Sequence, residues 1–209
     1  MTNRKVRNLV LLGTLVALVA TAGCSCKEYE EQIMQLDAQI AELQQNLSDR
    51  DGVISEREQV AEDLRQNLDD CKGENAVLVE ESEEVVIITV QDQLSFNASQ
   101  VIVLDTMVPV LDAIASTIRQ HADWDVYVEG YTDSRGVLEE YQEQYPSNWE
   151  LGAFRSSAVV RYMIGQMGLP AERFAAVSFG STRPVADNDT AEGRKANRMV
   201  RFVLYKNEM

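Results

Sequence analysis

The stretch Gly130-Tyr131-Thr132-Asp133-Ser134-Arg135-Gly136 decides the fold of the C-terminal half of this 209-residue chain. Residues 125–129, Asp-Val-Tyr-Val-Glu, precede it and alternate polar with apolar side chains, which predicts a β-strand. Beyond a polar loop, Ser147 and Glu150 have the spacing of a capping box, which predicts the start of a helix. The stretch is therefore expected to form the turn that leaves a strand and leads toward a helix.

Two charged residues in this arrangement form a candidate binding pair. Asp133 is expected at the end of the strand, and Arg155 about two turns into the helix. A carboxylate and a guanidinium on adjacent elements can face one pocket and bind a zwitterion, with an ammonium on Asp133 and a carboxylate on Arg155. Taken singly, both residues have simpler interpretations, because an Asp in a turn often bonds its own backbone and a helical Arg often lies on the surface.

The same segment resembles the OmpA-like peptidoglycan-binding domain family. Gly130 to Asp133 resembles the family's Gly-His-Thr-Asp turn. Asn148, Leu151 and Arg155 resemble its Asn-x-x-Leu-Ser-x-x-Arg-Ala helix. A third block, from Gly180 to Arg198, resembles the closing segment of the family. Three blocks in the same order make the resemblance specific, and it covers about residues 85–209.

One part of the helix points to a branch of this family. Residues 147–151, Ser-Asn-Trp-Glu-Leu, are most similar to the branch shared with the flagellar motor protein MotB. The sequence also departs from the family pattern at four positions that do not include Asp133 or Arg155. The usual His, Ser, Ala and Arg are replaced here by Tyr131, Gly152, Ser156 and Met199.

The resemblance implies a ligand, the peptide stem of peptidoglycan, bound at meso-diaminopimelate. Asp133 would bind the side-chain ammonium of the diaminopimelate, and Arg155 its carboxylate. Further pocket residues implied by the resemblance are Thr132, Asn148 and Leu151, with Asn97 as a weaker candidate at the edge. Arg194 and Arg198 also match family positions, and we interpret them as structural pairs more than as ligand contacts. No metal and no cofactor are expected.

Hydrophobic periodicity predicts the other elements of the domain. Strands are expected at 85–90, 124–132, 174–179 and 199–205, and helices at 104–121 and 147–168. Strands joined through helices need crossover connections, so the pattern predicts an α/β (α+β) sandwich with helices on one face. The resemblance implies that this is an OmpA-like domain of βαβαβ type. The acidic run 80–84 is expected to be a solvated approach to the first strand.

The N-terminus has the features of an export signal. Residues 1–23 combine basic side chains with an apolar run, Leu9 to Ala20, that is short for a membrane-spanning helix. Ala22-Gly23-Cys24 resembles a bacterial lipobox, which implies that Cys24 is lipidated. By the same resemblance, Ser25 favours transfer to the outer membrane. An uncleaved N-terminal membrane anchor is the alternative.

Residues 24–84 are predicted to be a lipid-anchored tether and coiled coil. Ile33, Ile40, Leu47, Ile54, Ala61 and Leu68 recur every seven residues, and Tyr29, Leu36, Leu43, Leu64 and Cys71 follow three positions later. Ile at the first of these positions with Leu at the second favours a parallel two-stranded coil, hence a homodimer that a Cys71 disulfide could link. A hairpin at Gly52 and a solitary solvated helix are the alternatives.

Composition excludes several functions. The formal net charge of −15 argues against nucleic-acid binding, which needs clustered Lys and Arg. His121 is the only histidine, so no histidine metal cluster can form. It is expected to end a helix as a cap or surface group, so no Ser-His-Asp triad is expected either. With these functions disfavoured, the resemblances to the OmpA-like family and to a lipobox imply a non-catalytic lipoprotein that tethers the outer membrane to peptidoglycan. A MotB-like inner-membrane motor protein is the alternative, although residues 9–22 lack the acidic residue of an ion relay.

Overall fold

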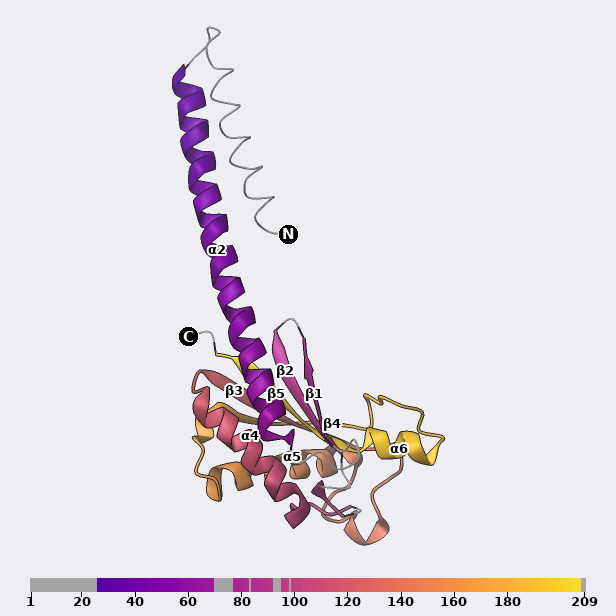
Figure 1. Cartoon of the computed structure of the whole chain (residues 1–209). Coiled ribbons are helices and arrows are strands. Elements are labelled where there is room, and N and C mark those ends of the chain that lie inside the picture. Colours follow the sequence, from indigo (N-terminus) through magenta and orange to yellow (C-terminus); the bar gives the residue numbers. More distant parts are fainter. Residues whose placement is uncertain (1–25, 70–76, 83, 92–94, 98, 208–209) are drawn as a thin grey trace. The chain divides into compact units, whose positions relative to one another are not determined.

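The computed structural model describes residues 26–69, 77–82, 84–91, 95–97 and 99–207 (Figure 1). The chain divides into two compact units, residues 1–52 and 53–209. The predicted export signal, the lipidation site Cys24 and the heptad residue Cys71 lie outside the described residues.

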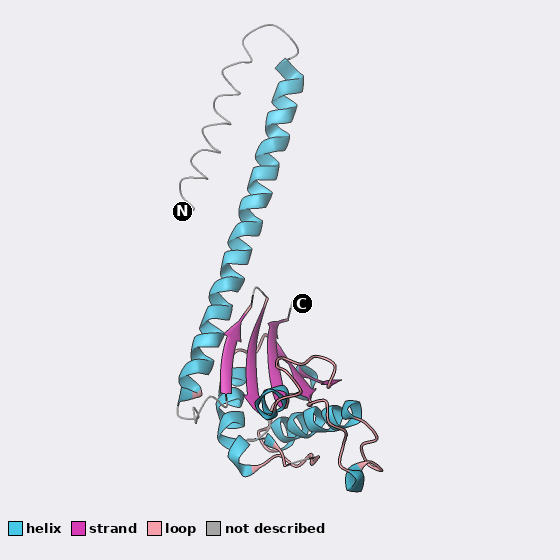
Figure 2. Cartoon of the chain, turned by 90° about the vertical axis from the view of Figure 1, so that its right-hand side faces the viewer, coloured by secondary structure: helices cyan, strands magenta, loops and turns pink. Residues whose placement is uncertain are grey.

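The larger unit contains a five-stranded sheet, which Figure 2 shows with its strands side by side. Its strands are β1 (Val77–Glu81), β2 (Val85–Gln91), β3 (Trp124–Tyr131), β4 (Phe174–Gly180) and β5 (Met199–Lys206), in the spatial order β1-β2-β5-β3-β4. β3 and β4 pair in parallel, and the other neighbours pair antiparallel. The helices are α2 (Cys26–Asn67), α4 (Val108–Gln120), α5 (Asn148–Gly165) and α6 (Ala191–Asn197). The predicted mixed α/β fold is confirmed.

One strand differs from the sequence prediction. Residues 80–84 were expected to be a solvated approach, but Glu80 and Glu81 end the edge strand β1. Val77 and Val79 pack against the core, whereas Leu78 between them is exposed. The alternation of half-buried and exposed apolar residues covers only residues 77–79, and the acidic run follows at once. The sequence pattern was therefore too short to predict a strand here. Charged residues on an edge strand also discourage pairing with other chains.

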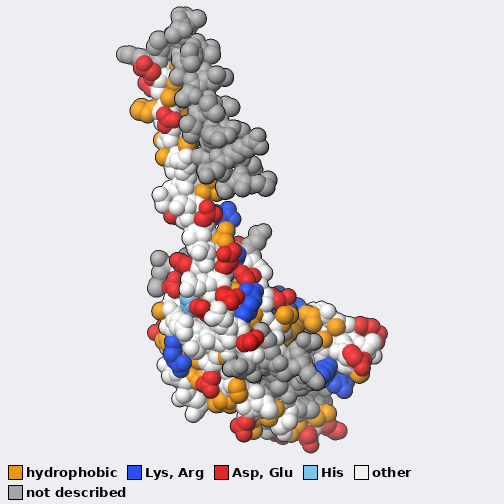
Figure 3. Space-filling view, in the orientation of Figure 1, with side chains coloured by type: hydrophobic (Ala, Val, Ile, Leu, Met, Phe, Trp, Pro, Cys, Tyr) orange, Lys and Arg blue, Asp and Glu red, His pale blue; other side chains and the backbone are white. Residues whose placement is uncertain are grey.

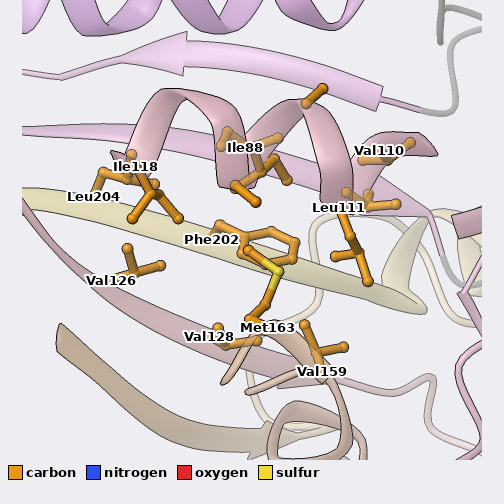
Figure 4. Packing of buried hydrophobic residues seen from close by; sticks show 14 of the residues in the cluster. Ile88, Val110, Leu111, Ile118, Val126, Val128, Val159, Met163, Phe202 and Leu204 are labelled. Atoms are coloured by element: carbon orange, nitrogen blue, oxygen red, sulfur yellow. The ribbon is translucent and has the colours of Figure 1, made fainter. Parts of the chain in front are cut away.

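The core lies between the sheet and helices α4 and α5, which cover the same face of the sheet (Figure 4). On α4, the apolar residues at positions i, i+1, i+4 and i+8 are buried, as the helical period requires: Val110, Leu111, Ile114 and Ile118. They meet alternate residues of the strands, including Ile88, Val128 and Phe202, and α5 adds Val159 and Met163. The inward-facing positions of β2, β3 and β5 thus form one layer.

The C-terminal part of α2 belongs to this same core. Val60, Ala61, Leu64 and Leu68 are fully buried in it. Polar contacts surround them, since Asn67 Nδ2 donates to Thr117 Oγ1 at 3.0 Å and His121 Nε2 lies 2.8 Å from Asp63 Oδ2. Three of the four apolar residues were expected in a coiled-coil seam. The compact unit accordingly begins at Val53, whereas the sequence placed the domain boundary at residue 85.

Within residues 26–52, α2 carries the heptad positions from Tyr29 to Leu47. The helix continues through Gly52, as predicted. Its large apolar side chains in this part are mostly exposed, among them Tyr29, Leu36, Leu43 and Leu47. Within the described ranges, no helix is both long and apolar enough to cross a membrane.

Candidate functional site

The candidate site begins where β3 ends. The Thr132 amide donates to the Gly180 carbonyl at 2.9 Å, so the turn after β3 stays tied to the end of β4. Asp133 follows and is buried. From the first residue of α5, Asn148 Nδ2 donates to the carbonyl oxygens of Asp133 and Arg135 at 3.1 and 2.9 Å. The loop that carries Asp133 is therefore held by the helix that follows it.

The N-terminus of α5 is set against the sheet by a close approach of two glycines. A Cβ atom on Gly130 would lie 2.2 Å from the Gly152 carbonyl oxygen, and one on Gly152 would lie 2.4 Å from Ser178 Oγ. The predicted cap is present, because Ser147 Oγ accepts from the Trp149 amide at 3.1 Å and donates to Glu150 Oε2 at 2.5 Å. The absence of a side chain at position 152 thus lets the helix approach the strands.

Arg155 lies on the same face of α5 as Asn148 and Leu151 and is buried. Its Nε donates to the Gln100 carbonyl oxygen at 2.9 Å, and its Nη2 donates to that of Asn97 at 3.0 Å. The guanidinium carbon also lies 5.0 Å from the centre of the Phe96 ring. The segment between β2 and α4 therefore fixes the orientation of this guanidinium.

The Asp133 carboxylate is surrounded by arginine donors. Oδ1 accepts the Arg135 amide at 2.9 Å. Oδ2 accepts Arg135 Nε at 3.2 Å, Arg135 Nη2 at 3.0 Å and Arg198 Nη1 at 2.6 Å. Burial by itself would raise the pKa of Asp133, but the hydrogen bonds from Arg135 and Arg198 outweigh burial and lower it below its usual value. Asp133 is consequently an anion at neutral pH.

Residues of the third sequence block hold the loop after β3 through hydrogen bonds. The Ser134 amide donates to Asn188 Oδ1 at 3.1 Å, and Asn197 Nδ2 donates to the same oxygen at 3.0 Å. Asn197 Oδ1 in turn accepts the amides of Val185 and Ala186, each at 2.8 Å. Because Arg198 follows α6 directly, this network places its side chain on Asp133.

One cavity of about 450 Å³ brings these residues together. All five predicted pocket residues line it: Thr132, Asp133, Asn148, Leu151 and Arg155. Asn97, the weaker candidate, lines it too, with Phe96, Ser99, Arg135, Gly136, Leu138 and Arg198. A larger hollow of about 590 Å³ is lined by Leu138, Glu139 and Glu140, whose side chains include no cationic group.

The cavity differs in charge from the rest of the chain. Three guanidinium groups, those of Arg135, Arg155 and Arg198, line it with one carboxylate. The chain as a whole carries a formal charge of −15, and acidic side chains are spread over the face shown in Figure 3. The cavity can therefore hold a ligand with several carboxylates and one ammonium. Among the residues that the structure describes, no cluster of His, Cys, Asp or Glu could hold a metal ion.

Sequence reasoning did not single out Arg135. It lies in a loop without periodicity, and the only available signal was its position two residues after Asp133, where side chain and backbone of an Asp commonly meet. Arg198 was predicted to be a structural pair, and it forms such a pair with Asp133 while also lining the cavity.

Comparison with known proteins gives the site a context. Residues 95–198 match the OmpA family model. An uncharacterized Bacillus subtilis protein, YtxE, is 39% identical over 60% of this chain and 50% of its own length. Motility protein B of Bacillus subtilis is 27% identical over 65% of this chain and 51% of its own length. The chain thus spans about half the length of these two curated relatives.

One solved structure matches a larger share of this chain than either of these two relatives. It is described as the cell wall anchor of the T6SS from Pseudomonas aeruginosa, with 31% identity and a TM-score of 0.62. The match covers 69% of this chain and 97% of that one. The similarity therefore extends over nearly the whole of the solved domain.

Proposed function

Because this chain carries a C-terminal domain of the OmpA family, we propose that the cavity around Asp133 and Arg155 binds the peptide stem of peptidoglycan at meso-diaminopimelate. The diaminopimelate side chain ends in an ammonium and a carboxylate on one carbon. Asp133 binds the ammonium, Arg155 orients the carboxylate, and Thr132, Asn148 and Leu151 line the pocket. No step in this function breaks a covalent bond, so the role is binding and not catalysis.

The observation that carries the proposal is the convergence of two buried, opposite charges on one cavity. Asp133 comes from the end of β3 and Arg155 from α5, and both are almost completely buried. Burying a charge is costly unless it is paired and hydrogen-bonded. A fold that keeps both charges at the wall of a cavity, with their backbone partners fixed, is preorganised for a zwitterionic ligand.

For the whole protein, we propose an outer-membrane lipoprotein that connects the membrane to the cell wall. Its lipid is carried by Cys24 after removal of residues 1–23, and the heptad positions of residues 26–52 pair with a second copy as a parallel coiled coil. The exposed apolar residues of this part of α2, such as Leu36 and Leu43, support the pairing.

A MotB-like motor protein in the inner membrane is the second candidate. The match to a motility protein and the sequence Ser-Asn-Trp-Glu-Leu at residues 147–151 favour it. The apolar run before Cys24 contains no acidic residue, which disfavours an ion relay. The mass of the mature N-terminus separates the two candidates: a diacylated or triacylated Cys24 supports the lipoprotein, and an intact Met1 supports the motor-type anchor.

Pull-down of the full chain with purified peptidoglycan tests the binding site. Asp133→Ala and Arg155→Ala are each expected to lower the affinity by about 2–5 kcal/mol, because truncation leaves the ammonium or the carboxylate of the bound ligand without its partner. Arg155→Lys is expected to bind poorly as well, since an ammonium cannot form a planar fork with a carboxylate.

Two exposed residues provide matched controls for these variants. Arg161 lies on the same helix as Arg155, and Asp189 lies in a loop, and neither lines the cavity. Arg161→Ala and Asp189→Ala should bind like the parent chain. Circular dichroism would establish that each variant is folded. Parent-like binding by a folded Asp133→Ala or Arg155→Ala chain would show that the cavity is not the peptidoglycan site.

A further inference from the structure

One oxygen of the Asp133 carboxylate, Oδ2, already accepts its full number of hydrogen bonds from within the chain. A carboxylate offers about four lone-pair sites. Asp133 accepts four hydrogen bonds, one on Oδ1 from the Arg135 amide and three on Oδ2 from Arg135 and Arg198. Its side chain is only 6% exposed. An ammonium that binds Oδ2 must therefore displace one of the three donors on that oxygen.

The two arginines differ in their exposure to solvent and in the lengths of their bonds to Asp133. The Arg198 side chain is 29% exposed, its bond is 2.6 Å long, and its amide donates to the Arg194 carbonyl oxygen at the end of α6. The Arg135 side chain is 65% exposed, and its two guanidinium contacts are 3.0 and 3.2 Å long. Exposed ion pairs contribute little to stability because water screens them and ordering the side chains costs entropy. The Arg135 guanidinium is thus the donor that leaves most readily.

Only the side chain of Arg135 has to move. Asn148 Nδ2 holds the Arg135 carbonyl at 2.9 Å, and the Arg135 amide remains bonded to Asp133 Oδ1. Both contacts are independent of the guanidinium. The loop can therefore keep its conformation while the side chain turns outward from the rim of the cavity.

We propose that Arg135 is an internal competitor for the ammonium site, which its guanidinium occupies until an amine-bearing ligand displaces it. The inference rests on the proposed function, since it assumes that the ligand ammonium binds Asp133. A ligand whose amine is charged replaces the lost ion pair with its own. A ligand whose amine is acylated cannot do so and leaves Asp133 short of a cation. Arg135 thereby sets both the affinity of the site and its selectivity for a free amine.

Calorimetric titration of the full chain with two soluble probes tests this competition. The first probe is a disaccharide tripeptide that ends in meso-diaminopimelate with a free side-chain amine, and the second is the same molecule acetylated at that amine. Arg135→Gln is expected to bind the amine probe roughly two- to fivefold more tightly than the parent chain, the range that an exposed ion pair contributes. Arg135→Lys keeps a competing charge and should stay within about twofold of the parent chain.

Two controls make the titration specific. Arg183 is exposed, its guanidinium carbon lies 3.7 Å from the centre of the Phe179 ring, and it does not line the cavity. Arg183→Gln should therefore leave the affinity unchanged. The acetylated probe should bind the parent chain at least tenfold more weakly than the amine probe. In NMR spectra that correlate each nitrogen with its bonded proton, the Arg135 Nε signal should shift when the amine probe is added. This signal is identified by its loss in Arg135→Gln.

Each outcome has a definite meaning. Equal or weaker binding of the amine probe by Arg135→Gln would overturn the competition while leaving the peptidoglycan site intact. Equal binding of both probes by the parent chain would also overturn it, because the amine would then not reach Asp133. Failure of the parent chain to bind either probe or whole peptidoglycan would remove the proposed function itself, and the competition with it.

Discussion

Leu64→Ala is the substitution that tests whether the end of α2 is part of the domain. Leu64 is fully buried in the core cluster that includes residues of α4 and the sheet. Removing a buried leucine side chain costs the transfer free energy of its methyl and methylene groups and leaves a cavity, together about 2–5 kcal/mol. At roughly 2–4 °C per kcal/mol for a unit of this size, the melting temperature should fall by about 4–20 °C.

Urea unfolding followed by tryptophan fluorescence is a suitable assay. The chain has two tryptophans, and Trp124 is buried in the core, so its emission reports the loss of packing. Leu43→Ala is the matched control, because Leu43 holds the same heptad position as Leu64 but is 60% exposed. It should change the unfolding free energy of the domain by less than about 0.5 kcal/mol. Equal effects of the two substitutions, or none from Leu64→Ala, would refute the assignment of this segment to the domain.

Two further predictions concern the site. Gly130→Ala should cost about 1–3 kcal/mol of stability and weaken peptidoglycan binding, because the new Cβ would meet the Gly152 carbonyl oxygen and displace α5; Gly136→Ala, with nothing within 4 Å, is the control in thermal melts. Since the folded-state pKa of Asp133 lies below its usual value of about 4, its contribution to stability is present above that pH and is lost as the pH falls through the folded-state pKa. Asp133→Asn should therefore show a shallower loss of unfolding free energy below about pH 4 in urea titrations, and an unchanged slope would contradict this origin.

Local signals were sufficient to predict most of the domain. The Ser147 cap, the apolar face of α4 and the alternation of β3 each depend on residues close in sequence, and all three are found in the structure. The pocket residues could be placed because a strand end and a helix face that follow each other in the chain also meet in space. Their convergence on one cavity additionally required the third block, which supports the loop through Asn188 and Asn197.

The heptad pattern did not predict which of its apolar residues are buried in the domain core. A repeat of apolar residues predicts that one face of a helix is covered, but it does not say by what. Leu43 and Leu64 are equivalent in the repeat, yet only Leu64 is buried by α4 and the sheet. Arg135 poses the same difficulty for charges, because its partner is set by the turn after β3 and not by any sequence period.

The charge distribution also bears on how a strongly acidic chain can bind a polymer that carries carboxylates. Repulsion between exposed charges is largely screened beyond about 8 Å at physiological ionic strength, so the formal charge of −15 acts only weakly at a distance. Inside the cavity, the guanidinium groups of Arg155 and Arg198 act on the ligand at contact distance, where screening is weak. Because Asp133 already pairs with Arg135 and Arg198, displacement of Arg135 by the ligand ammonium exchanges one cation beside Asp133 for another. Selectivity therefore depends on which cation faces Asp133, and not on the net charge of the protein.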